Sequence, residues 1–431
     1  MQLSRAIGFF HGNIFLFSAT IGAGIFISPK GVLKSSSGNI PVSLSIWALC
    51  GILNIVNGLC AAEIGATFPR SVATYFLLKR SLGSCVAFIS TWIKLVSYVV
   101  GISAQSLLVA SSLIQPFYAG CSPPELPKKC LALAILWSLG LLNIRGVKTV
   151  SWFQTLSSLV KVAILCFISL AGIVLLVMGR KENVSRFESA LDAELPDASQ
   201  IAEAILQGFY AYVGSTMLVN VAGEVKNPAQ TIPTSLISAM SIMIVIYLLT
   251  NISYLTVLTP EEIISSDSVA ATWVDRVLPS MQWVVSLGIS MSIVDTTSCG
   301  ILSGSRILYI ASQEGQLPRI FSMLNEHLSP AAAVIQYQNP DLPRPYKVWL
   351  PMIFASLASS AFLIFMPIIQ SPKMEHIYQV VFVLSGVLYY LLHVHFNQGS
   401  VYSEKITCYL QLLFNMSPSE DQENYISIEK H

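Results

Sequence analysis

Near the N-terminus, an apolar segment is interrupted by the sequence Thr20-Ile21-Gly22-Ala23-Gly24-Ile25-Phe26, and Pro29 follows shortly after. Each glycine weakens a helix by about 1 kcal/mol relative to alanine. Irregular backbone at membrane depth persists only where it is buried in protein or lines a water-filled cavity. We therefore expect a membrane helix that is broken at this point because its backbone groups serve a function.

A second apolar segment carries a similar interruption, Gln207-Gly208-Phe209-Tyr210-Ala211-Tyr212-Val213-Gly214-Ser215-Thr216. The two interruptions fall in the first and sixth apolar segments, which are corresponding positions of two five-helix repeats. Paired interruptions of this kind are the best sequence indication of a transporter site between inverted repeats. The unwound backbone offers N–H groups to a carboxylate and carbonyls to an ammonium, so an amino acid zwitterion suits both.

The alternative interpretation is that these glycines only allow close packing of membrane helices, as small residues at four-residue spacing do. That interpretation suits Gly300-Ile301-Leu302-Ser303-Gly304 in a later segment. For the first and sixth segments, the paired positions favour a binding site.

The composition requires lipid as the solvent. Of 431 residues, 54% are hydrophobic and 11% are charged, and the mean hydropathy is +0.65. Soluble proteins carry about 25% charged residues, so this much apolar surface could not be covered in water. The net charge of +1 gives no indication of nucleic acid binding. We expect no enzymatic activity, cofactor or metal, because the six histidines are scattered and no nucleophile, base or metal-ligand grouping stands out.

Ten segments are long and apolar enough to cross the hydrocarbon core, which takes about 20 helical residues. They are 7–34, 41–66, 84–117, 130–147, 151–178, 201–222, 232–257, 279–311, 348–369 and 376–397. Because they lack two-residue alternation, we expect helices rather than a barrel. The prediction is an all-α polytopic domain over 7–397, between a cytoplasmic N-terminus (1–6) and a cytoplasmic tail (398–431). Lys and Arg are more frequent in the loops that this topology places in the cytoplasm.

Five motifs together resemble the L-type amino acid transporters, the light chains of heteromeric amino acid transporters in the amino acid–polyamine–organocation superfamily. The first motif is Gly22-Ala23-Gly24-Ile25-Phe26-Ile27-Ser28-Pro29-Lys30-Gly31. The others are Ala62-Glu63-Ile64-Gly65, AGEVKNP at 222–228, SQEGQLP at 312–318 and RPYKV at 344–348. The likeness covers nearly the whole chain.

The resemblance implies a LeuT-type fold with two inverted five-helix repeats and sodium-independent exchange by alternating access. It further implies that aspartate, glutamate and also cystine cross the plasma membrane, at the apical face of an epithelium. Carried over to this sequence, the carbonyls of Thr20, Tyr210 and Val213 would face the substrate ammonium, and the amides of Ala23 and Gly24 would face its carboxylate. Tyr210 would be the gating aromatic. The other site positions are Ile21, Gly22, Ala211 and Gly214.

The resemblance also implies twelve spans, two more than the ten segments found here. Residues 329–335 look like the opening of the ninth span, and residues 336–345 look like the loop before the eleventh. Spans nine and ten therefore look deleted as a block near 335/336. Because the tenth span flanks the permeation path in this fold, the alternative function is a truncated, non-transporting variant that binds the partner chain.

One of the eight cysteines is singled out by its position. Cys121 lies in the loop 115–124, which the predicted topology places in the oxidising extracellular space. An internal bridge to Cys130 is one alternative. The resemblance favours a disulfide to a single-span glycoprotein heavy chain such as rBAT. The sequon Asn183-Val184-Ser185 falls in another outside loop and is a candidate glycosylation site.

Charged residues inside predicted spans are costly and functional by default. Lys94 either neutralises the side chain of an acidic substrate or pairs with Asp295, and both alternatives stay open. Lys161 is expected to extend its amine toward the interface. Glu224 is expected to be a cytoplasmic gate or cap. The sequence Thr259-Pro260-Glu261-Glu262 predicts the start of a short helix on the outer side. The resemblance implies that this helix is an extracellular lid.

Overall fold

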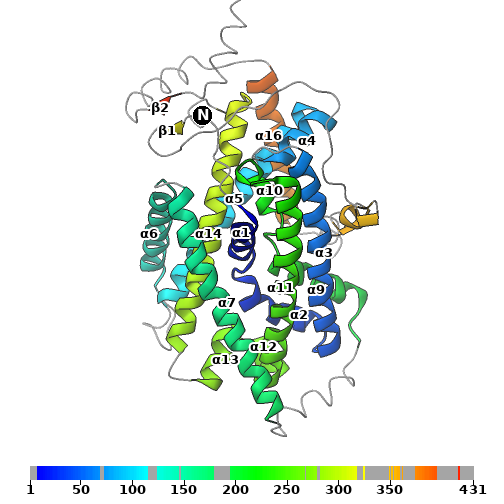
Figure 1. The fold of residues 1–431 in the computed structure, drawn as a ribbon, viewed down its shortest axis with the longest axis vertical. Coiled ribbons are helices and arrows are strands. Elements are labelled where there is room, and N and C mark those ends of the chain that lie inside the picture. Colours follow the sequence, from blue (N-terminus) through cyan, green and yellow to red (C-terminus); the bar gives the residue numbers. More distant parts are fainter. Residues whose placement is uncertain are drawn as a thin grey trace, which may run out of the picture.

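The computed structural model describes residues 7–67, 72–114, 124–144, 147–178, 195–266, 268–278, 282–317, 324–325, 349, 351–352, 354–359, 362, 374–395 and 416–417. Over these residues the chain forms an elongated helical bundle (Figure 1). The short helices α4 and α10 lie toward one end of the bundle, and α12 and α13 lie toward the other.

The predicted apolar segments form helices, and the all-α expectation is confirmed apart from a two-residue antiparallel pair, β1 (Leu324–Asn325) with β2 (Met416–Ser417). Segment 348–369 is described only in pieces. The helices are α1 (Phe9–Thr20), α2 (Gly24–Ser35), α3 (Ile40–Thr67), α4 (Ala73–Leu82), α5 (Ser84–Ile114), α6 (Glu125–Ile144), α7 (Val147–Val177), α9 (Ala198–Ala211), α10 (Met217–Asn220), the 3-10 turn η2 (Ala222–Glu224), α11 (Pro228–Val257), α12 (Pro260–Ser265), α13 (Val269–Val277), α14 (Gln282–Gln313), α16 (Met374–Tyr389) and the π-helix η5 (Tyr390–His395).

Several of these helices are suited to cross a membrane. Within the described ranges, four are long and apolar enough: α3, α5, α7 over Thr149–Val177, and α11. The pair α1–α2 makes a fifth if its two bent halves count as one span. Helix α9, with 14 residues, is too short to span alone.

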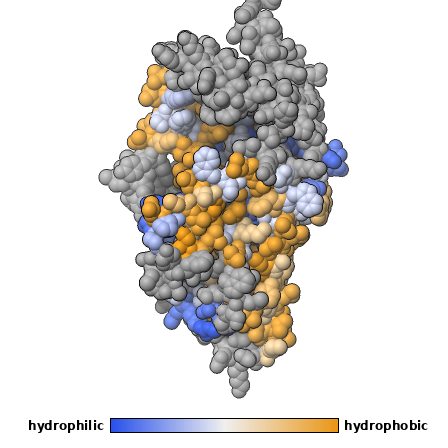
Figure 2. All heavy atoms as spheres, turned by 90° about the vertical axis from the view of Figure 1, so that its left-hand side faces the viewer, coloured by the Kyte–Doolittle hydropathy of each residue, from blue (hydrophilic) through white to orange (hydrophobic). Residues whose placement is uncertain are grey.

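Large apolar side chains cover the outer surface of the bundle. On α6, Trp137 is 68% exposed, and on α7, Trp152 is 72% exposed, with exposed leucines beside both. Figure 2 shows hydrophobic residues spread over much of one face. Exposed apolar side chains spread over so much of the surface are unusual on soluble proteins and are normal against lipid. The surface therefore supports a multi-pass membrane protein.

The predicted start of a short helix is confirmed at α12. The Glu262 N–H donates to the Thr259 hydroxyl at 3.2 Å, and the Thr259 N–H donates to the Glu262 carboxylate at 2.9 Å. The carboxylate also pairs with Arg276 of α13. The Thr259 backbone N–H, and then Arg276, hold the pKa of Glu262 below its usual value. The cap therefore stays charged as the pH falls toward the usual range of a glutamate.

Candidate functional site

The first predicted interruption is a real break. Helix α1 ends at Thr20, residues 21–23 are not helical, and α2 begins at Gly24 after a bend of 53°. The Gly22 N–H turns back to the Thr20 carbonyl at 2.9 Å, while the N–H groups of Phe26 and Ile27 bond to the Ala23 carbonyl. The amides that open α2, at Gly24 and Ile25, precede any intrahelical acceptor. They are thus available to an anion.

The second predicted interruption is also a break. Helix α9 ends at Ala211, residues 212–216 form turns, and the single-turn α10 follows. Gly214 has φ +132°, a conformation that side chains rarely adopt. Its neighbour Val213 bonds through its N–H to the Tyr210 carbonyl at 3.2 Å and keeps its side chain half exposed. A β-branched residue is thus accommodated because glycine takes the strained position.

The two breaks touch each other. A Cβ on Gly24 would lie 2.6 Å from the Ala211 Cα, and one on Gly214 would lie 2.6 Å from the Ala19 carbonyl oxygen. The hydroxyl of Tyr247, on α11, reaches the carbonyls of Thr20 and Ala211, each at 3.4 Å. Segments that lie almost 200 residues apart therefore form one contact between broken helices.

The structure brings most of the predicted site residues together. Thr20, Ile21, Gly22, Ala23 and Gly24 form the first break, and Tyr210, Ala211, Val213 and Gly214 line the second. The Tyr210 side chain is 58% exposed, so in this conformation it is not packed into the interior. Cys121 and Asn183 lie outside the described residues.

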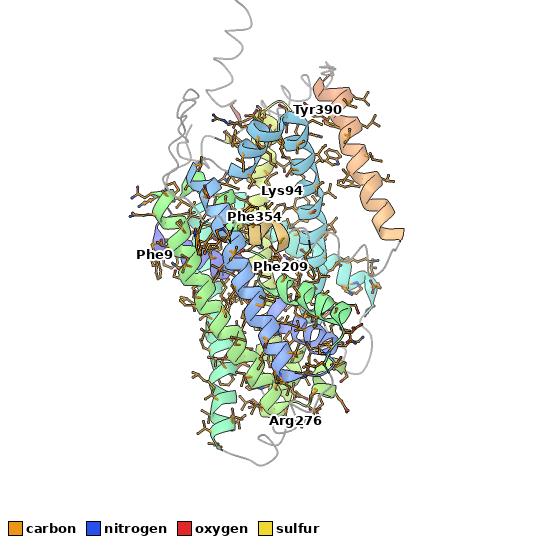
Figure 3. All side chains as sticks on the ribbon, turned by 90° about the vertical axis from the view of Figure 1, so that its right-hand side faces the viewer. Phe9, Lys94, Phe209, Arg276, Phe354 and Tyr390 are labelled. Carbon is orange, nitrogen blue, oxygen red and sulfur yellow. The ribbon has the colours of Figure 1, made fainter. Side chains whose placement is uncertain are left out.

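Lys94, the remaining predicted site residue among those described, does not lie at either break. Its ammonium donates to the Thr74 hydroxyl at 2.9 Å, which ties α5 to α4. Figure 3 shows Lys94 displaced from Phe209, beside the second break, toward the end of the molecule that carries Tyr390. The hydrogen bond that the structure gives Lys94 is therefore not to either break.

One of the two alternatives for Lys94, its pairing with Asp295, is wrong, and so is the expectation for Lys161. Asp295, on α14, pairs with Lys161 of α7 at 2.8 Å, not with Lys94. Lys161 does not extend to an interface, because its side chain is 1% exposed. Its ammonium instead donates to the Ser18 carbonyl at 2.9 Å, near the end of α1. A carboxylate inside the bundle offers a buried amine a better partner than distant water does.

Tyr247 and Thr296 were not singled out by the sequence. Both sit in ordinary-looking apolar helices, and their contacts with the first break join residues more than 200 positions apart. A hydroxyl inside a span is a weak signal, because it can bond within its own helix. Thr296 also bonds to the Ser292 carbonyl in this way.

A second buried ion pair lies shortly after the second break in the sequence. Glu224, in η2, pairs with Arg306 of α14 at 2.9 Å. The backbone beside it is bridged to the start of the chain, since Ile7 and Val225 form an isolated parallel bridge. Glu224 therefore joins three elements at once, an arrangement suited to a gate or cap. Among the described residues, no three His, Cys, Asp or Glu side chains gather as a metal site.

Broken apolar helices that meet inside a membrane bundle, with freed amides and carbonyls at the contact, define the class of membrane transporters. Residues 7–337 match the sequence profile of the family described as amino acid permease. The chain belongs to this family.

Relatives support the assignment along the whole length. Solute carrier family 7 member 12 of Mus musculus is 57% identical, over 98% of this chain and 99% of the relative. Solute carrier family 7 member 13 of Homo sapiens is 46% identical, over 96% and 97%. The b(0,+)-type amino acid transporter 1 of Homo sapiens is 30% identical, over 97% and 94%. These similarities confirm the resemblance that the motifs indicated.

The alignments also expose a difference in length. The alignment with the mouse member 12 runs over 463 positions, whereas this chain has 431 residues. At least 32 positions therefore face no residue of this chain. The proposed junction near 335/336 lies outside the described residues.

Proposed function

We propose that this chain is a sodium-independent amino acid exchanger light chain that works by alternating access on a LeuT-type fold of two inverted repeats. The contact between the two broken helices is the observation that carries this proposal. In such folds, half-helix N-termini attract anionic substrate groups while unwound carbonyls take cations. The fixed ammonium of Lys161 on the Ser18 carbonyl supports a carrier that requires no metal cation there.

The backbone of the two breaks would bind the substrate zwitterion. The amides of Ala23 and Gly24 would take the carboxylate, and the carbonyls of Thr20, Tyr210 and Val213 would take the ammonium. The described conformation brings the breaks into direct contact, so substrate entry requires them to separate. Tyr210, exposed here, would then swing toward the substrate as the gate.

We propose acidic substrates, aspartate and glutamate, with cystine as a further substrate. Lys94 supports this choice because it is a membrane-embedded cation whose hydrogen bond goes to a neutral hydroxyl, that of Thr74. Its position toward one end of the bundle (Figure 3) suits a charge that attracts an anion along the path rather than at the breaks.

The partner would be a single-span glycoprotein heavy chain, joined through Cys121 and escorting the light chain to the plasma membrane. Cys130, the rival partner for Cys121, is a free and exposed thiol, which favours a bond between chains. Asn183 would carry a glycan on the same outer side.

The difference in length favours a second candidate function. Two spans require about 40 residues, and the 463-position alignment leaves a gap of that order. A chain without spans nine and ten would bind the heavy chain but not transport.

Uptake into proteoliposomes tests the proposal directly. Purified light chain with its heavy chain is reconstituted, and the uptake of labelled aspartate, glutamate and cystine is measured with and without sodium. We expect sodium-independent uptake that rises when unlabelled substrate is loaded inside, as exchange requires. Lys94→Met should raise KM for aspartate while sparing a neutral amino acid. Normal capture of the heavy chain with no flux would instead establish the second candidate.

A further inference from the structure

A compact polar centre lies against the end of α1, just before the first break. Lys161 comes from α7, and Asp295 and Thr296 are neighbours on α14. The Lys161 ammonium lies 2.8 Å from the Asp295 carboxylate and 2.9 Å from the Ser18 carbonyl. Both charged side chains are fully buried, at 1% and 0% exposure. This centre thus connects two long helices to the backbone of a third.

The Ser18 carbonyl is free to accept because the helix breaks. In a continuous α-helix it would receive the Gly22 N–H, but that N–H bonds to the Thr20 carbonyl instead. The carbonyl end of a helix carries partial negative charge, which a cation stabilises. Lys161 therefore completes the hydrogen bonding of the broken end.

Thr296 holds the next part of the same loop. Its hydroxyl lies within hydrogen-bond distance of the Ile21 carbonyl, at 3.3 Å, and of the Ser18 carbonyl, at 3.2 Å. A Cβ on Gly22 would come within 3.1 Å of that hydroxyl. The loop from Ile21 to Ala23 is therefore packed directly on α14, one residue from Asp295.

Stability alone does not explain the buried ion pair of Lys161 and Asp295. Replacing a buried ion pair by apolar residues is often neutral or even stabilising, whereas removing only one partner costs about 3–5 kcal/mol in other proteins. A pair that also orders backbone at a binding loop has a further use, because preorganised groups lose less freedom on binding.

We propose that Asp295 is a positioning residue for substrate binding: it holds the Lys161 ammonium on the Ser18 carbonyl and so fixes the loop Ile21–Ala23 that receives the amino acid. This inference rests on the proposed function. Asp295 does not touch substrate itself, and its effect passes through Lys161 and the end of α1.

The test compares wild type, Asp295→Asn, Lys161→Met and the double variant Lys161→Met/Asp295→Asn, with Lys79→Met as control. Lys79 belongs to an exposed ion pair with Glu314, and loss of such pairs has little effect. For each protein we measure the folded yield and the KM and maximal rate of amino acid uptake. The loop position is read separately, from the rate at which Ala23→Cys reacts with a water-soluble thiol reagent, relative to the same protein without that cysteine.

We expect both single variants to lose most of their folded yield, and the double variant to regain it. The double variant should still show a KM raised about tenfold, the equivalent of one lost charge-assisted hydrogen bond, and an altered labelling rate at Ala23→Cys. The control should match wild type in every measurement.

Two results would overturn the inference. Single variants as stable as wild type would show that the ion pair does not form, and a double variant with wild-type KM and labelling would show that it only supports the fold. If wild type itself takes up no amino acid, the proposed function fails, and the labelling rates alone still decide whether Asp295 fixes the loop.

Discussion

Gly24 lies at one of the two closest approaches between the halves of the candidate site. An added Cβ would meet the Ala211 backbone at 2.6 Å, a distance that real side chains do not reach. Backbone at this contact cannot give way as a flexible side chain would, so Gly24→Ala must push α2 away from α9. Overpacking of this kind costs about 1–3 kcal/mol.

We therefore expect Gly24→Ala to lower uptake at least about tenfold, since the displaced amides are those predicted to bind the substrate carboxylate. Gly101→Ala is the matched control, because Gly101 also lies in a long apolar helix but an added Cβ there would meet nothing within 4 Å. Initial uptake rates are compared at equal amounts of folded protein. Equal rates for both variants would show that the contact does not matter to transport.

At the same scale, the sequence predicted the breaks but not their partners. Gly22, Gly24 and Gly214 act locally, so their effect on the helix can be recognised from neighbouring residues. Tyr247, and the pairing of Lys161 with Asp295, depend on which helices pack together. On sequence grounds Lys94 was the only partner considered for Asp295. Helix α14 packs against both α5 and α7, and the contact at Asp295 is with Lys161 of α7.

The short segment α10–η2 is held by contacts with three other parts of the chain. The Val72 N–H bonds to the Asn220 carbonyl at 3.0 Å, which attaches the segment to the start of α4. Ile7 bridges it to the N-terminus, and Glu224 pairs with Arg306 of α14. The predicted topology places all these contacts toward the cytoplasm, and the role we propose for them is to close that side.

Glu224→Gln should loosen this closure, because it leaves the Arg306 charge buried without its partner. We expect a cysteine at Ser215, buried beside the second break, to react at least about tenfold faster with a water-soluble reagent applied from the cytoplasmic side. The measurement uses inside-out vesicles, with Lys79→Met as the control for loss of an exposed pair. Unchanged labelling would mean that Glu224 is a helix cap rather than a gate.

Element boundaries followed from hydropathy where helices span the membrane, as in α3 and α11, which lie within four residues of their predicted segments. Hydropathy did not predict α4, which is short and carries Lys79 and Arg80 in its last turn. Its place in the fold depends on tertiary contacts such as the bond from Lys94 to Thr74. The short helix α12 could be predicted because its capping box is a local signal.

The whole molecule combines two broken helices that meet each other with an alignment gap of at least 32 positions relative to the mouse member 12. The two observations favour different functions. The breaks favour transport, whereas the proposed loss of spans nine and ten would expose the permeation path and so favours a non-transporting protein. The proposed binding of a heavy chain would depend on neither, because the proposed link is a loop cysteine remote in sequence from both.

Cys121 therefore gives a prediction that holds for either function. Coexpressed with the heavy chain, wild type should run on a non-reducing gel as a high-mass band that collapses on reduction, because a thiol in an oxidising loop forms a disulfide with the partner. Cys121→Ser should abolish that band, and Cys130→Ser, which removes an exposed thiol on α6, should leave it intact.

Loss of the band in the Cys130→Ser protein alone would place the link at Cys130. A band that both variants keep would show that neither cysteine joins the chains. With the band present, flux then separates an exchanger from a non-transporting partner.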